Sequence, residues 1–281
     1  MSNNKRTRRI GPGDIALMRF FRLNFQLTPE MLSDLCGRSV QVVRRRLEVL
    51  RRDGFLSTRP VPDLFNSPRV HFATFRGWEL MHAQGWTIPP TDFNLATLPS
   101  RKTPINVQIK SNKDFRHDLI IGSLFGRVRV QFTGDWKLKT WERLPAYVGV
   151  RSFDKTLIPD AFFRYESPDI EDGCIFLEVE NSNANSRDGV QSVVGKAALY
   201  ERYYSSGEFE RRWGAPNFRV VLLMRTWAIA QHQCRLMREE GGGFNSVRWY
   251  ITSVEASQNM RGRIFMTPKD YDKGVLYSLD Q

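Results

Sequence analysis

The sequence has little of what cross-links, zinc sites or membrane spans require. Only 3 of its 281 residues are cysteine, and Cys36, Cys174 and Cys234 lie far apart with no C-x-x-C spacing. Neither a disulfide framework nor a zinc site is therefore predicted, and such cysteine usage is consistent with a protein in a reducing compartment. No apolar run approaches the roughly 18 residues of a membrane span, and the charged start of the chain has no apolar core of the signal-peptide type. We expect a cytoplasmic protein with no membrane partner.

Acidic side chains are scarce relative to basic ones. Lysine and arginine number 42 against 30 aspartates and glutamates, which gives a net charge of +12. Residues 1–60 hold 13 basic and 5 acidic side chains, so most of the excess lies at the amino-terminal end. Such an excess favours an anionic partner. With 41% hydrophobic residues the chain can still bury a core, and its length allows two domains.

Two helices are predicted after a basic tail over residues 1–13. The first covers residues 14–26 and carries apolar residues on most of its sides, as a helix enclosed by neighbours does. The second begins with Thr28 as its cap and Pro29 at its first position, and Gly37 ends it. Gly37 begins a turn to the next helix, and two short helices joined by a glycine turn are typical of a helix-turn-helix.

A third helix is predicted over Val40–Arg52, capped by Ser39 and ended by Asp53-Gly54. At 100° per residue its apolar side chains share one arc, and other residues point away from it. The positions on the packed arc are Val40, Val43, Leu47 and Leu50, and those pointing away are Gln41, Val42, Arg45, Arg46 and Arg52. Arginine on the open side can neutralise phosphate or contact guanine in the major groove.

Two strands around a proline-containing loop follow, over residues 55–59 and 69–75, and then the segment TFRGWELMHAQG. Over residues 14–85 this order resembles the winged-helix regulators of bacteria and phages. We therefore expect a winged helix-turn-helix domain over residues 14–86 that binds double-stranded DNA without a cofactor, as a monomer or a homodimer. The predicted contact residues are Ser39, Gln41, Val42, Arg44, Arg45, Arg46, Arg52 and Arg69. A solvated arginine face, or a winged helix that binds protein, is the alternative.

A linker over residues 87–112 separates this domain from a second one over residues 113–281. Helical and strand patterns alternate in the second domain, which predicts an α/β domain with a central mixed sheet. The expected helices cover residues 114–127, 187–204 and 227–239, and the expected strands cover residues 128–132, 137–144, 155–165, 174–180, 218–224 and 247–254. Gly241–Gly243 lacks the spacing of a phosphate cradle, so no nucleotide cofactor is expected.

Several carboxylates lie in or beside apolar strands, where a charged side chain is unusual. Asp160 follows Pro159 beside an apolar strand, and Glu178 and Glu180 share one side of the next strand by its period of two. Glu142 lies on an earlier strand. Carboxylates that converge repel one another unless a divalent cation or a cationic partner offsets them, and hard oxygen ligands favour magnesium or manganese. Alternatively, these acids cap loops or pair with arginines.

This pattern resembles the PD-(D/E)xK nuclease superfamily, which has the restriction-endonuclease-like fold. The chain departs from it where Glu180 stands in place of the usual lysine, and Lys196 on the following helix, ahead of Tyr200, is the substitute that some members use. The resemblance implies a catalytic set of Asp160, Glu178, Glu180 and Lys196, with a metal on Asp160 and Glu178 and Glu142 as a further ligand.

The whole arrangement is similar to the replication-relaxation family of plasmids and integrated mobile elements. The motifs that carry the similarity are HDLIIGSLF, TWERL, IPDAFF, FLEVENSN and GKAALYERYY, behind the winged helix. The resemblance implies an α+β protein of two domains, a winged helix-turn-helix and a restriction-endonuclease-like domain, acting in replication, relaxation or transcription regulation of mobile DNA. A metal-dependent endonuclease targeted by the winged helix is the alternative function, and a protein-interaction module is a third.

Overall fold

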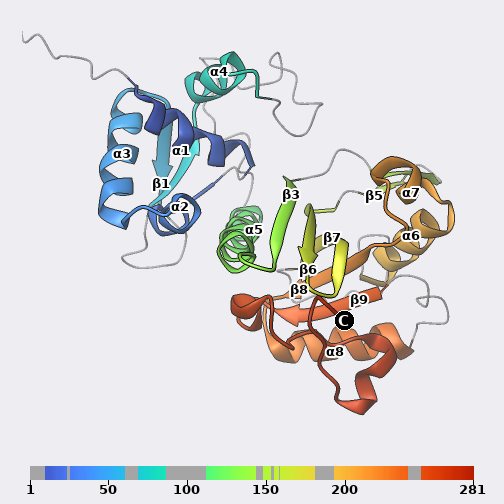
Figure 1. Cartoon of the computed structure of the whole chain (residues 1–281). Coiled ribbons are helices and arrows are strands. Elements are labelled where there is room, and N and C mark those ends of the chain that lie inside the picture. Colours follow the sequence, from blue (N-terminus) through green and yellow to red (C-terminus); the bar gives the residue numbers. More distant parts are fainter. Residues whose placement is uncertain are drawn as a thin grey trace, which may run out of the picture. The chain divides into compact units, whose positions relative to one another are not determined.

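The chain divides into two compact units in a computed structural model, over residues 1–126 and 127–281 (Figure 1). The described residues are 10–23, 26–60, 69–86, 112–143, 148–152, 155–157, 159–180, 193–239 and 248–281. The boundary between the units falls within the long helix α5 (Asn112–Gln131). The second unit therefore begins 14 residues after residue 113, where the second domain was predicted to start. Several sequence predictions fall partly outside the described residues. Among them are the tail up to residue 9, the hairpin loop, the linker up to residue 111, the start of the helix predicted from residue 187, and Gly241–Gly243.

The first unit begins with three helices, a hairpin and a fourth helix. These elements are α1 (Pro12–Leu23), α2 (Pro29–Cys36), α3 (Val40–Arg52), β1 (Leu56–Arg59), β2 (Val70–Ala73) and α4 (Phe75–Ala83). The local signals of α2 act as predicted, because the Thr28 hydroxyl accepts from the Met31 N–H at 3.2 Å and Gly37 ends the helix in the left-handed conformation. Ser39 begins α3 in an extended conformation, but its side chain makes no capping hydrogen bond.

The core of the first unit takes the inner side of α3. Val43, Leu47 and Leu50 are completely buried, as the helical spacing predicts. The hairpin closes onto the same core, with Leu56 opposite Ala73 in an antiparallel pair. At Gly77 of α4 a Cβ atom would lie 2.3 Å from the Phe55 carbonyl oxygen, so only glycine lets α4 approach the chain there.

The second unit adds strands and further helices to the end of α5. Its elements are β3 (Lys137–Arg143), β4 (Val148–Ser152), β5 (Lys155–Leu157), β6 (Ala161–Ser167), β7 (Ile170–Glu180), α6 (Val193–Ser205), α7 (Glu208–Trp213), β8 (Arg219–Met224), α8 (Trp227–Glu239), β9 (Arg248–Ser253) and the 3₁₀ helices η3 (Ala256–Asn259) and η4 (Pro268–Lys273).

Five of these strands form a mixed sheet in the order β3-β6-β7-β8-β9, so the predicted mixed α and β architecture is confirmed. The pairs β3-β6 and β6-β7 are antiparallel, whereas β7-β8 and β8-β9 are parallel. The parallel strands therefore end at one edge of the sheet, with Glu180, Met224 and Ser253 in a row. The remaining strands, β4 and β5, form a separate antiparallel pair.

Two strand predictions were wrong. The segment predicted as a strand over residues 128–132 continues α5 through Gln131, because Val128 and Phe132 are buried four residues apart while Val130 between them is 52% exposed. That spacing fits a helix and not a strand. The strand predicted over residues 155–165 is two strands, β5 and β6, which belong to different sheets.

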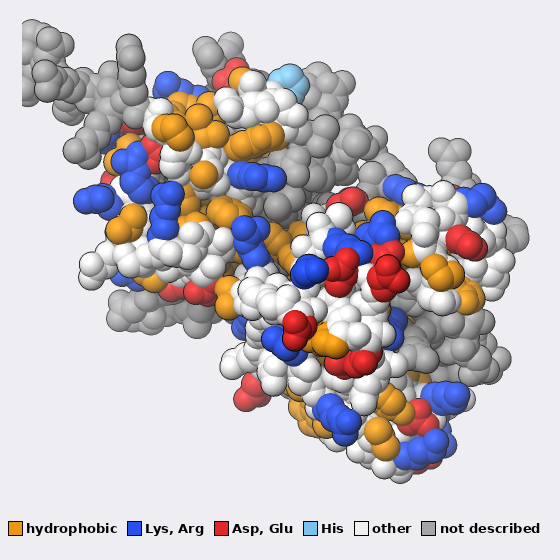
Figure 2. Space-filling model, in the orientation of Figure 1, with side chains coloured by type: hydrophobic (Ala, Val, Ile, Leu, Met, Phe, Trp, Pro, Cys, Tyr) orange, Lys and Arg blue, Asp and Glu red, His pale blue; other side chains and the backbone are white. Residues whose placement is uncertain are grey.

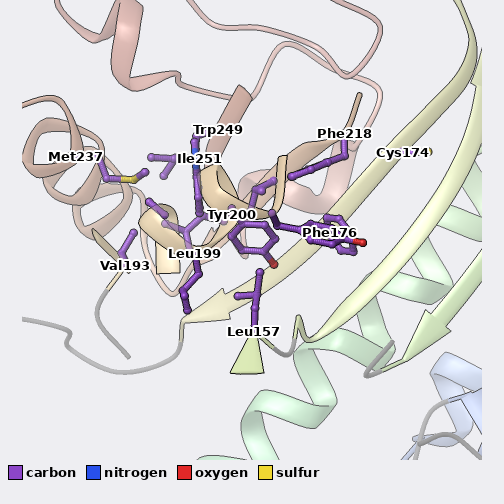
Figure 3. Close-up of a cluster of buried hydrophobic side chains, with 14 of the residues drawn as sticks. Leu157, Cys174, Phe176, Val193, Leu199, Tyr200, Phe218, Met237, Trp249 and Ile251 are labelled. Carbon is purple, nitrogen blue, oxygen red and sulfur yellow. The ribbon is translucent and has the colours of Figure 1, made fainter. Parts of the chain in front are cut away.

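An aromatic core covers one face of the five-stranded sheet. Phe176 of β7 lies beside Tyr200 of α6, with ring centroids 5.6 Å apart, and Phe218 packs edge-on against Phe176 at 5.1 Å (Figure 3). Tyr200 and Tyr203 of α6 are fully buried and fill this core. This packing fixes α6 over the carboxyl end of β7.

Cys36, Cys174 and Cys234 are all free thiols. Among the described helices, none combines the length and the apolar character that a bilayer crossing needs.

Candidate nucleic-acid interface and acidic cluster

The outer side of α3 is open to solvent. Gln41 and Arg45 are exposed and make no hydrogen bond or ion pair with other described residues, and Val42 beside them is 37% exposed. Lys and Arg side chains gather over the part of the surface where α3 lies (Figure 2). The outer side therefore offers a guanidinium, an amide and a small apolar group together.

Two arginines on the hairpin-facing flank of α3 are held by acids. The Nη2 of Arg44 lies 2.7 Å from Oε1 of Glu30 on α2, and both side chains are well exposed. Arg51 donates from Nε at 2.9 Å and from Nη2 at 2.5 Å to the two oxygens of Glu48. An exposed pair of this kind exchanges its partner easily, because it is worth little in water.

Arg46 lies on the other flank and is not part of the open side. Its Nε donates to Oδ1 of Asp14 at 2.6 Å, and its Nη2 donates to the other oxygen of the same carboxylate. The Asp14 side chain is fully buried, and that of Arg46 is 25% exposed. The helical spacing that pointed Arg46 outward did not reveal this acid on α1, so we leave Arg46 out of the open contact set.

Three further predicted contact residues stand at the ends of elements. Ser39 is exposed at the start of α3, and Arg52 at its end lies 3.3 Å from a carboxylate oxygen of Asp53. Arg69, just before β2, is exposed and makes no hydrogen bond or ion pair with a described residue. Positive charge thus reaches from α3 to the hairpin.

Three of the four predicted carboxylates, Asp160, Glu178 and Glu180, lie at the edge where the parallel strands end. Glu178 and Glu180 lie on one face of β7, opposite Leu222 and Met224 of β8. Asp160 stands at the start of β6, and its carboxylate accepts from the Val179 N–H at 2.7 Å. The topology therefore brings Asp160 and Glu178 together, as the period of two and the hairpin between them predict.

Lys196 and Tyr200 of α6 both donate to Glu178. The ammonium of Lys196 lies 2.5 Å from Oε2, and the Tyr200 hydroxyl lies 2.7 Å from Oε1. The Glu178 side chain is 1% exposed, and that of Lys196 is 22% exposed. Since Lys196 and Tyr200 are four residues apart, they stand on one face of α6 and grip both oxygens of the same carboxylate.

Burial and charge act in opposite directions on these groups. Burial raises the pKa of Glu178, while the ammonium and hydrogen bond of Lys196 lower it. Burial lowers the pKa of Lys196, but the carboxylates of Glu178 and Asp160 outweigh burial, so this pKa lies above its usual range. Burial, followed by the charge of Glu178, raises the pKa of Tyr200 well above 10. At neutral pH Lys196 is therefore the cation of the cluster and Tyr200 a neutral donor.

Protein groups offset the charge of Glu178. Both oxygens of Glu178 already accept from protein donors, and the ammonium of Lys196 supplies the positive charge that the converging carboxylates need. Within the described residues, no three His, Cys, Asp or Glu side chains gather as a metal-binding group. Lys196 is thus a cationic partner of the acids, which is one of the two ways to offset them that the sequence left open.

Glu142 lies apart from these contacts. It stands on β3 opposite Phe162, two residues along β6 from Asp160, and makes no hydrogen bond with a described residue. Burial raises its pKa. The contacts at Glu178 come from α6 instead, and the sequence signal that finds them is the four-residue spacing of Lys196 and Tyr200.

Comparison with known proteins gives one match. The family model described as Replication-relaxation matches residues 24–217, which is more than half of the chain. The match begins just before α2 and ends just before β8, so it includes α3 and the cluster around Glu178. No curated protein and no solved structure matches the chain.

Proposed function

Because the chain belongs to the replication-relaxation family, which suggests a role in the replication or relaxation of mobile elements, we propose that it binds DNA through the outer side of α3. In this proposal the first unit is a winged helix-turn-helix that recognises a site on a plasmid, phage or integrative element. Binding there serves replication, DNA relaxation or transcription regulation. The observation that carries the proposal is the open group of Gln41, Val42 and Arg45, on the helix whose inner residues Val43, Leu47 and Leu50 are buried.

The order of elements supports this proposal. Three helices, a two-stranded hairpin and a fourth helix follow one another as in winged-helix domains, and α3 occupies the position of the recognition helix. Arg45 is suited to a bidentate contact with guanine, Gln41 to adenine, and Val42 to a thymine methyl group. Arg52 and Arg69 stand at the two ends of this surface, where phosphate contacts would fix the orientation of the domain.

The test is a duplex-binding series at increasing salt. If six phosphates are contacted, affinity should fall by roughly three orders of magnitude between 50 and 200 mM salt, because each contact releases counterions. Arg45→Ala should cost about 1–3 kcal/mol of binding to the preferred sequence. The matched control is Arg19→Ala on α1, an exposed arginine that makes no hydrogen bond or ion pair with a described residue. Affinity that does not change with salt, or equal losses from both variants, would contradict the proposal.

A metal-dependent endonuclease is the second candidate function. It is favoured by Asp160 and Glu178 on adjacent strands and by Lys196 on the helix that follows. These residues belong to the catalytic set that the nuclease resemblance implies. Against it, both oxygens of Glu178 already accept from Lys196 and Tyr200.

Supercoiled plasmid incubated with magnesium or manganese separates the two functions. The DNA-binding proposal expects no nicking by the wild-type chain or by Asp160→Ala. The endonuclease candidate expects nicking that Asp160→Ala abolishes. Equal nicking by both proteins would indicate a contaminating nuclease, which removes the enzyme claim as well.

A further inference from the structure

A hollow of about 290 Å³ lies in the first unit between α2, α3 and the hairpin. Charged or ionisable side chains from each of these elements line it. They are Glu30, Arg44, Glu48, Arg51, Arg69 and His71. The hollow flanks the proposed contact surface, because Arg44, which lines it, and Arg45, on the outer side, are neighbours about 100° apart around α3.

The charges that line the hollow leave one guanidinium in excess. Arg44 is paired with Glu30, and Arg51 is paired with Glu48, so these four groups largely cancel. Arg69 faces the hollow without an ion pair or hydrogen bond to any described residue. The hollow therefore attracts an anion, and its strongest unsatisfied donor is Arg69.

His71 supplies a second group with unused hydrogen-bonding capacity. The residue is 7% exposed, and its Nδ1 is buried with no hydrogen-bond partner among the described residues. Two backbone hydrogen bonds with Leu27, of 2.9 and 3.1 Å, and the register opposite Thr58 fix its position. Arg69 and His71 are two residues apart at the start of β2, so they point to the same side. A buried ring nitrogen without a partner is unfavourable, and a ligand acceptor would satisfy it.

We propose that this hollow binds a phosphate group between Arg69 and His71, and that the group belongs to the backbone of the bound duplex. The inference rests on the proposed function and adds a phosphate-binding site beside the open side of α3. Arg69 donates from its guanidinium, and His71 donates from Nδ1–H. Because Arg44 and Arg51 stand in exposed pairs, each can turn from its glutamate toward the anion.

His71 also reports on the occupant. In the free protein burial lowers the pKa of His71 to about 4. The charges of Glu48 and Glu30 raise this pKa slightly, and those of Arg51 and Arg69 lower it slightly. The ring is therefore neutral at pH 7. A phosphate within hydrogen-bond distance favours the protonated ring, so its binding raises the pKa of His71.

The first experiment titrates inorganic phosphate into the full chain with isotope-labelled histidine and follows the ring resonances by NMR. The chain has 4 histidines, so His82, His117 and His232 serve as internal controls. We expect the His71 resonance to move with phosphate and the other three to stay in place. Arg69→Gln should remove the movement, and an unmoved His71 resonance in the wild-type chain overturns the proposal.

The second experiment measures duplex affinity of Arg69→Gln against Arg19→Gln, which loses the same charge outside the hollow. We expect Arg69→Gln to weaken binding about tenfold on any sequence and to reduce the salt slope by about 1, as loss of a phosphate contact does. The control should lose less than about twofold.

The two experiments separate the source of the phosphate and the fate of the proposed function. If His71 responds to phosphate while Arg69→Gln binds duplex as the wild type does, the backbone occupant is overturned and a free phosphate compound takes its place. If His71 responds but the wild-type chain binds no duplex, the proposed function is wrong and phosphate binding in the hollow is still supported. Movement of His71 together with the tenfold loss supports the full inference.

Discussion

Each unit of the chain buries a carboxylate that holds a basic side chain of a neighbouring helix, and the two pairs differ in how the acid is satisfied. In the first unit Arg46 donates to both oxygens of Asp14. In the second unit Lys196 donates to one oxygen of Glu178, and Tyr200 donates to the other. The exposed fractions are nearly equal, at 0% and 1% for the acids and 25% and 22% for the bases.

The two pairs differ because the two basic side chains present their hydrogen-bond donors differently. A guanidinium has a rigid fork of donors that can match a carboxylate by itself, whereas an ammonium is a point charge that leaves the second oxygen to another donor. Arg46 is consequently committed to the packing of α1 against α3. The Glu178 cluster is assembled from separate groups, which is also how catalytic sites are built.

Removing Lys196 should produce the largest effect. Lys196→Met leaves Glu178 as an unpaired buried carboxylate, which we expect to lower the free energy of unfolding by about 3–5 kcal/mol at pH 7. Since burial raises the pKa of Glu178, the folded state binds this proton more tightly than the unfolded state does. The variant should therefore gain stability as pH falls from 8 to 5, measured by urea unfolding at each pH.

The matched control for that variant is Glu178→Gln/Lys196→Met, which removes both charges and keeps an acceptor for Tyr200. It should recover most of the lost stability and show a weaker pH dependence. A double variant no more stable than Lys196→Met would mean that packing, and not the unpaired charge, dominates the cluster.

Removing Arg46 should have the next largest effect, of about 2–4 kcal/mol, because among the described residues the buried Asp14 then keeps only the Gly11 N–H at 3.0 Å as a donor. Hydrogen exchange of the α1 and α3 amides localises the loss to the first unit. Arg44→Met is the control, since its pair with Glu30 is well exposed and its loss should leave exchange unchanged. Equal effects from both variants would erase the distinction between the buried and exposed arginines.

Tyr200→Phe should have the smallest effect of the three, about 1–2 kcal/mol, because it removes one hydrogen bond and leaves the ion pair. It should also raise the pKa of Glu178 further, since a donor to the carboxylate is lost. Urea unfolding measures the loss, and Tyr204→Phe, whose hydroxyl bonds Asn217 at the surface, is the control. A loss as large as that of Lys196→Met would show that the hydroxyl, and not the charge, holds Glu178.

Several elements could be predicted because their signals are local. The bounds of α2 and α3 follow from Thr28, Pro29, Gly37 and the helical spacing of Val43, Leu47 and Leu50. The sharing of one face by Glu178 and Glu180 follows from the strand period alone. Where a local pattern was ambiguous the prediction was wrong: residues 128–132 alternate like a strand but continue α5, since burial at a spacing of four residues decides the conformation there.

What the sequence determined by itself was the arrangement of apolar positions, caps and charged residues along the chain, and with it a basic α3 and an acidic strand end. Only the tertiary structure decided which charges stay available: Asp14 takes Arg46 from 32 positions away, Lys196 and Tyr200 close on Glu178, and His71 is left beside Arg69. The reason is that ion pairs and hydrogen bonds depend on distances through space, and folding sets these distances between residues that lie far apart along the chain.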